Sequence, residues 1–320
     1  MEQLVDSSVQ PPGRAASTPD APAPGACFGF SVRSALPFVY LRPGGGVPLQ
    51  VTESDGTPPP TSEPLISWAP TAARPFHARL FGAGNRYDYW VEGAGWFGIE
   101  PHAPRIIAPP TDSPVRREER IWGLPALLCF TARGDVPLHA AALEVNGGAI
   151  LVVAPGRFGK TTLAGAFIAS GHRLLAEDTS CCRITDPPLV LPGPAMLRLR
   201  ADVYPHVRVP ETKIVAEDDV RFHLALDDRA RGDSAPVPIH SIVFLRPGGE
   251  RCELTPADPL RAVPDLWAQS FRLPIQEEEG RRFCRLVDLA SRVPLWNLAR
   301  PRGFERLPEV VERVVAVCGA

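Results

Sequence analysis

The feature that most constrains this chain is an apolar segment followed at once by a glycine-containing loop. Ala149-Ile-Leu-Val-Val has only apolar side chains, as a central strand buried on both faces of a sheet requires. Residues 160–170 are then expected to form a helix, because Gly171 suits the position just after a helix end. His172-Arg-Leu-Leu-Ala-Glu-Asp follows with the character of another strand. This order of strand, loop, helix and strand predicts an α/β fold.

The loop itself, Ala154-Pro-Gly-Arg-Phe-Gly-Lys-Thr-Thr, is a variant of the Walker A sequence Gly-x-x-x-x-Gly-Lys-[Ser/Thr], with Ala154 in place of the first glycine. Backbone N–H groups in such a loop can curl around an anion, and the N-terminus of the following helix favours the same negative charge. Lys160 would hold the β- and γ-phosphates of ATP or another nucleoside triphosphate, and the Thr161 hydroxyl would bind Mg²⁺. The residues expected to contact the nucleotide are Gly156, Arg157, Phe158, Gly159, Lys160, Thr161 and Thr162.

Lysine usage singles out the same loop. Lys160 and Lys213 are the only lysines, whereas arginine supplies positive charge everywhere else. This usage favours a specific need for a compact ammonium at Lys160, since arginine and lysine are not equivalent at phosphate sites, with a chance retention of two lysines as the alternative. Lys213 is a candidate contact to a phosphate or an acidic substrate group, or else an exposed loop lysine. Arg198 and Arg200 are further candidates to face the nucleotide.

Two acids and a histidine are expected beside the loop. Glu177 and Asp178 end the strand that follows the helix, and ligands of parallel α/β sheets bind at the carboxyl ends of strands. One acid on Mg²⁺ and one on an acceptor hydroxyl is what phosphoryl transfer needs; the alternative is a solvated acidic strand end. His139 precedes a strand and an Asn146-Gly turn, as a functional or a purely structural histidine.

The rest of the chain predicts two ordered domains. Residues 1–26 are rich in Pro, Ala, Ser and Gly and are expected to be disordered. Residues 27–115 contain short aromatic runs such as Phe38-Val-Tyr-Leu, separated by Pro/Gly turns, which indicates a small, mostly β domain. Residues 116–320 are assigned to the α/β domain. Its expected further elements are a helix from Arg116 to Thr131, a strand at residues 239–245, a helix from Asp258 to Phe271 and a C-terminal helix from Pro308.

Composition excludes some classes of partner. The net charge is −2 and no Lys/Arg-rich run occurs, so nucleic acid is not expected. The longest apolar stretch, around residues 124–130, is too short to cross a bilayer, so no membrane association is expected. No signal peptide is visible, and the seven cysteines lack a Cys-x-x-Cys pair, which favours reduced thiols in the cytoplasm. The sequence leaves open whether the chain forms a homo-oligomer.

Together these residues resemble the catalytic domain of the HPr kinase/phosphorylase family. The shared order is His139 before a strand–turn–strand, the Walker A loop from Ala154 to Thr161, and Gly171-His-Arg-Leu-Leu-Ala-Glu-Asp. Phosphoenolpyruvate carboxykinases have a related nucleotide-binding core. The chain departs from the family pattern at Ala154, has Glu-Asp where the family has Asp-Asp, and lacks the Glu-x-Arg-Gly-x-Gly signature of the bifunctional members, so phosphorylase activity is not expected.

The resemblance implies a Mg²⁺-dependent kinase that phosphorylates a hydroxyl. By this resemblance Glu177 is the base toward the acceptor, Asp178 serves Mg²⁺, and His139 lies beside the transferred phosphoryl group. The chain is most similar in character to the HPr-kinase-like proteins of peptide natural-product clusters, which implies a serine of a peptide or protein as acceptor. Two alternatives stay open: a kinase for a small-molecule alcohol, and a nucleotide-sensing module without catalysis.

Overall fold

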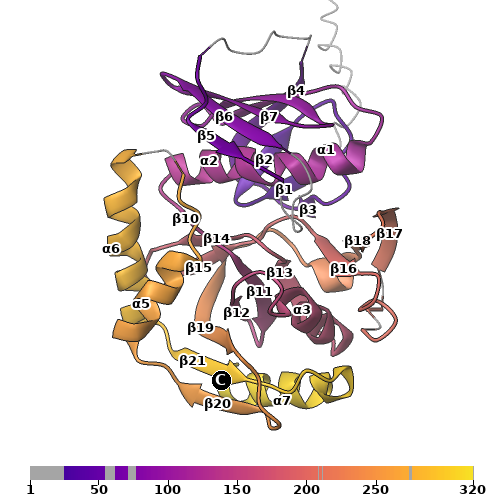
Figure 1. The fold of residues 1–320 in the computed structure, drawn as a ribbon, viewed down its shortest axis with the longest axis vertical. Helices are drawn as coiled ribbons and strands as arrows, with labels where there is room; N and C mark the ends of the chain where they lie inside the picture. Colours follow the sequence, from indigo (N-terminus) through magenta and orange to yellow (C-terminus); the bar gives the residue numbers. More distant parts are fainter. Residues whose placement is uncertain are drawn as a thin grey trace, which may run out of the picture.

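The computed structural model describes residues 25–54, 62–70, 77–207, 209–210, 212–273 and 276–319. The tail predicted to be disordered, residues 1–26, lies outside the described residues except for Gly25 and Ala26, which begin the first strand. The described chain is a mixed α/β structure with two nine-stranded sheets and one three-stranded sheet (Figure 1).

The first sheet is built by the N-terminal part of the chain. Its strand order is β3-β1-β2-β4-β9-β8-β7-β6-β5, in which only the β2–β4 and β4–β9 pairs are parallel. The strands are β1 (Gly25–Cys27), β2 (Phe30–Arg33), β3 (Arg42–Pro43), β4 (Val47–Glu53), β5 (Ile66–Trp68), β6 (Ala78–Ala83), β7 (Arg86–Val91), β8 (Gly95–Glu100) and β9 (Arg105–Ala108).

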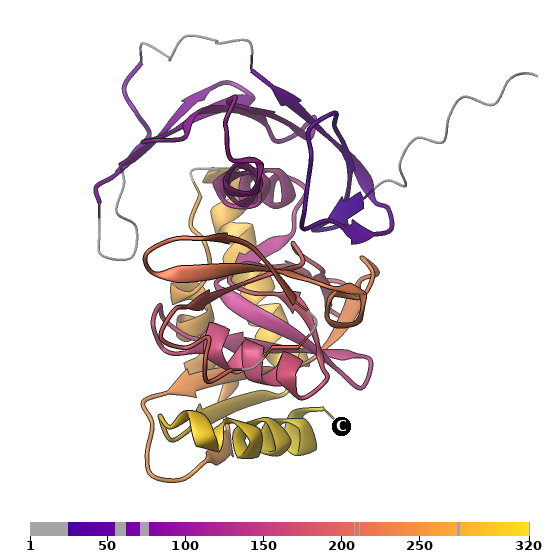
Figure 2. The ribbon, with the colours of Figure 1, turned by 90° about the vertical axis from the view of Figure 1, so that its right-hand side faces the viewer.

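Two helices fill the hollow of the first sheet, which arches over them (Figure 2). They are α1 (Pro114–Ile121) and α2 (Leu124–Ala132), where the sequence predicts one continuous helix. The helix is interrupted because Gly123 leaves helical geometry and Pro125 has no N–H to donate. Their buried side chains share one hydrophobic core with the first sheet. The predicted domain boundary at residues 115 and 116 therefore falls inside α1, whose packing partner is the first sheet.

The second sheet carries the segment on which the sequence analysis centres. Its order is β10-β14-β15-β19-β12-β11-β13, and β21 pairs with β19 and β20. β12 is parallel to β19, and β19 to β21, so the sheet is mixed and not wholly parallel. The strands are β10 (Val136–Leu138), β11 (Ala140–Val145), β12 (Gly148–Val153), β13 (Arg173–Ala176), β14 (Ser180–Arg183), β15 (Leu189–Leu191), β19 (Val237–Arg246), β20 (Glu253–Pro256) and β21 (Leu295–Ala299).

The direction of β13 matters for the site. β11 pairs antiparallel with both β12 and β13, so β12 and β13 run the same way although β11 lies between them. Their carboxyl ends therefore lie at the same edge of the sheet. The loop after β12 and the acids after β13 are brought to one edge, as predicted, but through an intervening strand.

Helices cover both faces of the second sheet. α3 (Lys160–Ala169) and α7 (Leu307–Cys318), the latter preceded by the 3₁₀ turn η1 (Phe304–Arg306), pack on one face. α5 (Pro259–Ala268) and α6 (Gln276–Arg292) pack on the other. Side chains of β12 alternate accordingly, with Val152 on the α3 face and Leu151 on the α5 face. No helix in the described part of the chain has the length and apolar character needed to cross a bilayer.

A three-stranded antiparallel sheet lies beside α3. It has the order β16-β18-β17, and its strands are β16 (Met196–Arg200), β17 (Thr212–Glu217) and β18 (Arg221–Leu226), followed by the short helix α4 (Asp228–Arg231). Leu197 and Leu199 of β16 enter the core shared with α3. Because side chains alternate along a strand, Arg198 and Arg200 lie on the opposite face of β16.

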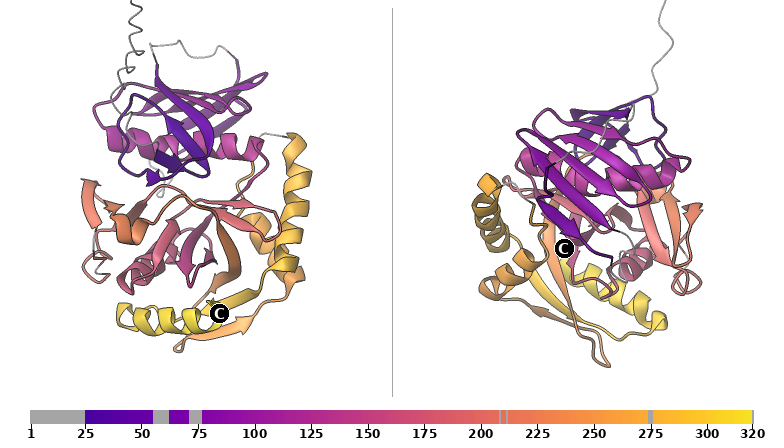
Figure 3. Two further views of the ribbon diagram at one scale, coloured as in Figure 1. Left: turned by 180° about the vertical axis from the view of Figure 1, so that it is seen from behind. Right: turned by 45° about the horizontal axis from the view of Figure 1, so that its top comes forward.

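Arg42 joins the first sheet to the second. Its side chain on β3 is fully buried, with Nε donating to the carbonyl of Gly193 (2.7 Å). One terminal nitrogen donates to the carbonyls of Leu174 (2.7 Å) and Leu175 (3.1 Å) on β13. Seen from behind, the first sheet and its helices lie at one end of the molecule, above the second sheet (Figure 3). Arg42 thus ties the first sheet to the strand that ends at Glu177 and Asp178.

Glu118 of α1 holds residues 38–41, which the sequence analysis describes as a short aromatic run typical of a β domain. Residues 38–41 form a loop, and the Glu118 carboxylate accepts the backbone N–H groups of Val39 (2.5 Å) and Tyr40 (3.0 Å). Its side chain also accepts from Trp122 Nε1 (3.0 Å). A buried carboxylate therefore supplies the acceptors that a neighbouring strand would otherwise provide.

Candidate active site

The loop after β12, residues 154–159, is here called the glycine loop. Residues 155–158, which include Arg157 and Phe158, are exposed. Arg157 and Gly159 have positive φ angles of 67° and 90°. A Cβ on Gly159 would lie 2.4 Å from the guanidinium of Arg300, so this position needs glycine both for its φ and for space. The first N–H groups of α3 have no partner within the helix and lie at this loop.

The packing around Ala154 shows why an alanine can replace the first glycine of the Walker A pattern. Ala154 is 2% exposed and its methyl group packs in the core on the α3 face of the sheet. A small apolar side chain is therefore accommodated at this position without obstructing the exposed part of the loop.

Lys160 extends back along the glycine loop. Its Nζ donates to the carbonyls of Ala154 (2.8 Å) and Pro155 (3.3 Å) and lies 3.0 Å from His139 Nε2. Lys160 is buried, and this burial lowers its pKa, although the charges of Asp178 and Glu177 oppose that shift. The ammonium is thus held at the loop and has no carboxylate in direct contact among the described residues.

The two acids after β13 have different surroundings. Glu177 Oε1 accepts from the Thr161 hydroxyl (3.0 Å), and its Oε2 accepts from Arg198 Nε (2.9 Å). The Glu177 side chain is 1% exposed, whereas that of Asp178 is 44% exposed. Asp178 Oδ1 lies 3.1 Å from His139 Nε2 and its Oδ2 lies 3.7 Å from Arg198. Glu177 is therefore enclosed and oriented by two donors, while Asp178 is open to solvent.

His139 connects Asp178 with Lys160. Its Nδ1 lies 3.0 Å from Oε1 of Gln269, and its backbone N–H donates to the Gln269 carbonyl (2.7 Å). Donation from Nδ1 to this amide oxygen leaves Nε2 as the acceptor in the neutral ring. Nε2 then accepts from Lys160, and in the protonated ring it donates to Asp178. His139 thus contacts both Lys160 and Asp178 through the same ring nitrogen.

Arg198 sets the charge balance of the acid pair. The charge of Glu177 raises the pKa of Arg198 further, against the cost of burial. Partial burial would raise the pKa of Asp178, but the hydrogen bond from His139 and the charge of Arg198 hold it well below its usual range. Asp178 is therefore ionised across the physiological pH range, as a ligand of a metal cation must be.

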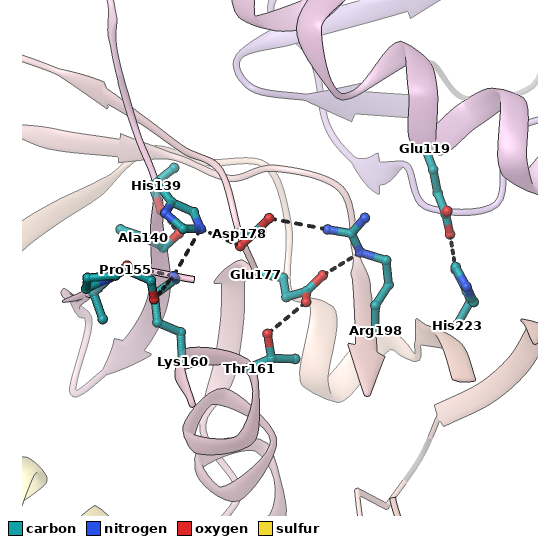
Figure 4. A network of polar contacts seen from close by, with 12 residues as sticks. Glu119, His139, Ala140, Pro155, Lys160, Thr161, Glu177, Asp178, Arg198 and His223 are labelled. Carbon is teal, nitrogen blue, oxygen red and sulfur yellow. Dashed lines mark hydrogen bonds and ion pairs between the residues drawn. The ribbon is translucent and has the colours of Figure 1, made fainter. Parts of the chain in front are cut away.

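A separate set of polar contacts lies beside this cluster and links β18 with α1 (Figure 4). His223 of β18 is the cross-strand partner of Arg198 and is buried. Its Nδ1 lies 2.6 Å from Glu119 Oε1, and its Nε2 lies 3.1 Å from Asp218 Oδ2. Glu119 also accepts from the Tyr40 hydroxyl (3.1 Å). The hydrogen bond with Glu119 raises the pKa of His223 despite burial.

The donor set fits a hard cation such as Mg²⁺. Mg²⁺ prefers oxygen ligands and usually retains waters and substrate phosphates in its shell. Thr161, Glu177 and Asp178 supply a hydroxyl and two carboxylates at one point of the sheet edge. Among the described residues no group of three or more His, Cys, Asp or Glu side chains is arranged to hold a metal alone. Thr161 and Asp178 are the residues that would hold Mg²⁺, and their binding of a metal stays a prediction.

The predicted residues fall into two groups. His139, Lys160, Thr161, Glu177, Asp178 and Arg198 form one connected cluster. Arg200 instead forms an ion pair with Asp202 on the surface, and Lys213 is exposed on β17, so neither belongs to that cluster. Thr162 is half-buried on α3, next to the Thr161 hydroxyl that contacts Glu177. Contacts of these three residues with a substrate stay a prediction.

Sequence reasoning missed Gln269, Glu119, His223 and Arg300. Gln269 lies 130 positions from His139, and Glu119 lies 104 positions from His223. No local motif contains either pair, and only the tertiary structure brings each pair together. The one weak indication of Gln269 in the sequence is the helix predicted from Asp258 to Phe271, which places Gln269 near a helix end.

Comparison with known proteins adds little. No protein-family description matches the sequence, and no curated protein is similar to it. Among solved structures, the HPr(Ser) kinase/phosphatase from Coxiella burnetii is similar with a TM-score of 0.31 and 11% identity, over 56% of this chain and 88% of that chain. A likeness at this level carries no inference.

Proposed function

We propose that this chain is a Mg²⁺-dependent kinase that transfers the γ-phosphate of ATP, or of another nucleoside triphosphate, to a hydroxyl. The observation that carries the proposal is the convergence of Lys160, His139 and Asp178 at the glycine loop. A cation, a histidine and an ionised carboxylate from three separate segments meet beside an exposed loop and a helix N-terminus. Phosphoryl transfer consists mainly of positioning and charge stabilisation, and these are the groups it uses.

The proposed transfer gives each residue one task. The acceptor oxygen forms a bond to the γ-phosphorus as the bond to the β-phosphate oxygen breaks, and the nucleoside diphosphate leaves. Glu177 takes the hydroxyl proton, and Arg198 on its other oxygen holds the carboxylate in place. Lys160 stabilises charge on the phosphates, with His139 beside the moving group. Bound Mg²⁺ would neutralise phosphate charge.

The surroundings of the two acids support this division of labour. The Thr161 hydroxyl donates a hydrogen bond to Oε1 of Glu177. If this hydroxyl turned toward a metal, Oε1 would be free to contact the hydroxyl that is to be phosphorylated. Asp178 is the more exposed acid, as suits a ligand of a cation that retains waters and phosphate oxygens. Both roles agree with the resemblance to the HPr kinase/phosphorylase family.

The acceptor is proposed to be a serine of a peptide or protein, on the resemblance to HPr-kinase-like proteins alone. A small-molecule alcohol and a nucleotide sensor without transfer are the competing readings. An acceptor screen that compares serine peptides with free alcohols and amino acids distinguishes a peptide kinase from a small-molecule kinase. Phosphate transfer to any acceptor distinguishes both kinases from a nucleotide sensor.

Binding of ATP with and without Mg²⁺ to wild-type protein and to Lys160→Ala tests the nucleotide site. We expect Mg²⁺-dependent binding that Lys160→Ala weakens by about tenfold or more, since a phosphate loses its charge-assisted contact. Lys160→Arg should not restore it, because the bulkier guanidinium does not fit the place of the ammonium. Equal affinity of wild type and Lys160→Ala would remove the basis of the proposed function.

A further inference from the structure

The proposed reaction indicates a direction in which a bound nucleotide can extend. His139 lies just before β11 and Asp178 just after β13, and these two strands lie on one side of β12. β19 and β21 lie on the other side of β12. With its phosphates at the glycine loop, a nucleotide can extend its nucleoside across the carboxyl ends of β19 and β21. This step rests on the proposed function.

Arg300 stands at the start of that path. It follows β21, and its guanidinium lies 2.4 Å from the position that a Cβ of Gly159 would take, next to the glycine loop. Its hydrogen bond within the described residues goes to the carbonyl of Pro301 (3.3 Å), and no ion pair with an acid is found there. Burial lowers the pKa of Arg300. A half-buried guanidinium without an acidic partner, next to an anion-binding loop, suits a phosphate of the ligand.

A cavity of about 420 Å³ lies farther along the same path. Asn297 in its wall is in register with Phe244, which is in register with Val153 at the start of the glycine loop. Asn297 thus lies two strands from the loop, about 10 Å at ordinary strand spacing. The opposite wall is the first turn of α5, with Asp258 and Arg261. The cavity volume falls within the usual range for small-ligand sites.

The cavity wall suits a neutral planar group better than an anion. Arg246 is already paired with Asp265 (2.6 Å), donates to Asn297 Oδ1 (2.6 Å) and has its guanidinium carbon 5.2 Å from the ring centre of Phe244. The Asn297 amide N–H groups have no partner among the described residues and are available as donors. A guanidinium plane for stacking and an amide for hydrogen bonding are what a nucleobase requires.

From this arrangement we propose that the cavity between β19, β21 and α5 is the nucleoside site, and that Arg300 contacts the phosphates between it and the glycine loop. Asn297 and Arg261 then contact the base and ribose and contribute to affinity for a nucleotide but not for its phosphates alone. The position of the cavity predicts that the nucleotide lies along the carboxyl edge of the second sheet.

Affinities for MgATP and for Mg-tripolyphosphate, measured by calorimetry, test the proposal. Asn297→Ala and Arg261→Ala should each weaken ATP binding by about five- to tenfold and leave tripolyphosphate binding unchanged, since each loses base or ribose contacts only. Arg300→Ala should weaken both ligands. The matched controls are Asn85→Ala in the turn after β6 and Arg313→Ala on α7, both exposed and expected to bind like wild type. Melting curves show whether each variant folds. If Asn297→Ala does not fold, Arg261→Ala still tests the proposal, because Arg261 is exposed and its loss should not disturb the fold.

Each result has one reading. ATP affinity of both cavity variants equal to that of the controls overturns the nucleoside site, as does equal wild-type affinity for ATP and tripolyphosphate. Unchanged tripolyphosphate affinity in Arg300→Ala overturns the role of Arg300. If wild-type protein binds neither ligand, the proposed function fails and this inference fails with it, whereas nucleotide binding that depends on Lys160 and not on the cavity overturns this inference alone.

Discussion

At the scale of single residues, His139 shows how a distant side chain can decide the chemistry of a site. Its Nδ1 contacts Gln269, and this contact decides which nitrogen faces Lys160 and Asp178. Partners of this kind commonly fix both the tautomer and the orientation of a functional histidine. Gln269 is therefore assigned a positioning role, acting through His139.

Gln269→Leu removes the oxygen that accepts from His139. We expect phosphoryl transfer to fall by about tenfold while the dissociation constant for MgATP stays unchanged, because the nucleotide contacts remain. Gln269→Glu retains an acceptor oxygen and should restore most of the rate. Gln50→Leu, an exposed site on β4, is the control. If Gln269→Glu were as slow as Gln269→Leu, positioning through the hydrogen bond would be the wrong account.

At the scale of elements, the His223 bridge joins α1 to the small sheet that presents Arg198. His223 lies between the carboxylates of Glu119 and Asp218; Arg116 pairs with Asp218 (3.6 Å), and Arg198 is the cross-strand neighbour of His223. Because the hydrogen bond with Glu119 raises the pKa of His223, the folded state favours the charged ring. This bridge thus depends on pH, unlike the apolar packing around it.

The sign of the effect follows from that raised pKa. The stabilisation that protonated His223 contributes is fully present below the pKa of the unfolded state, about 6.5. It is lost as pH rises through the higher pKa of His223 in the folded state. We expect the melting temperature of wild type to decline above that pH more steeply than that of His223→Gln, which lacks the titrating group. His102→Gln, at an exposed site, should follow wild type. Parallel declines in all three proteins would show that His223 contributes no pH-dependent stability.

The local elements around the loop were predictable because each depends on its own sequence. β12, α3 and β13 follow from an apolar run, a loop with Gly159, and Gly171. The interruption between α1 and α2 was missed, since Gly123 and a proline outweigh the continuous apolar pattern there. The insertion of β11 between β12 and β13 was also missed, because strand order is set by long-range pairing that no single segment encodes.

At the scale of the whole molecule, Arg42 connects the first sheet with the site. It donates to the backbone of β13 just before Glu177 and Asp178, so the first sheet helps to hold that strand. Desolvation by full burial lowers the pKa of Arg42 to about 10, which still leaves it charged at neutral pH. The cluster at the loop was foreseen from contiguous motifs, but this link between sheets could not be, since its partners lie more than 130 residues away.

Arg42→Ala leaves buried carbonyl oxygens of Gly193, Leu174 and Leu175 without their donor. We expect the free energy of unfolding to fall by about 3 kcal/mol or more, as is typical when one partner of a buried polar network is removed. Urea denaturation measures this loss, with Arg33→Ala, exposed on β2, as the control. A change no larger than that of Arg33→Ala would mean that Arg42 does not hold the two sheets together.

The most direct test of the central claim compares wild type with Glu177→Gln in one assay. Mass spectrometry follows phosphate transfer from ATP to serine-containing peptides, and calorimetry gives the dissociation constant of MgATP. The account predicts that transfer falls by about 100-fold or more, as for loss of a general base, while nucleotide affinity stays within about twofold. Unchanged transfer, or an equal loss of transfer and affinity, would contradict the role of Glu177 as the base of a kinase.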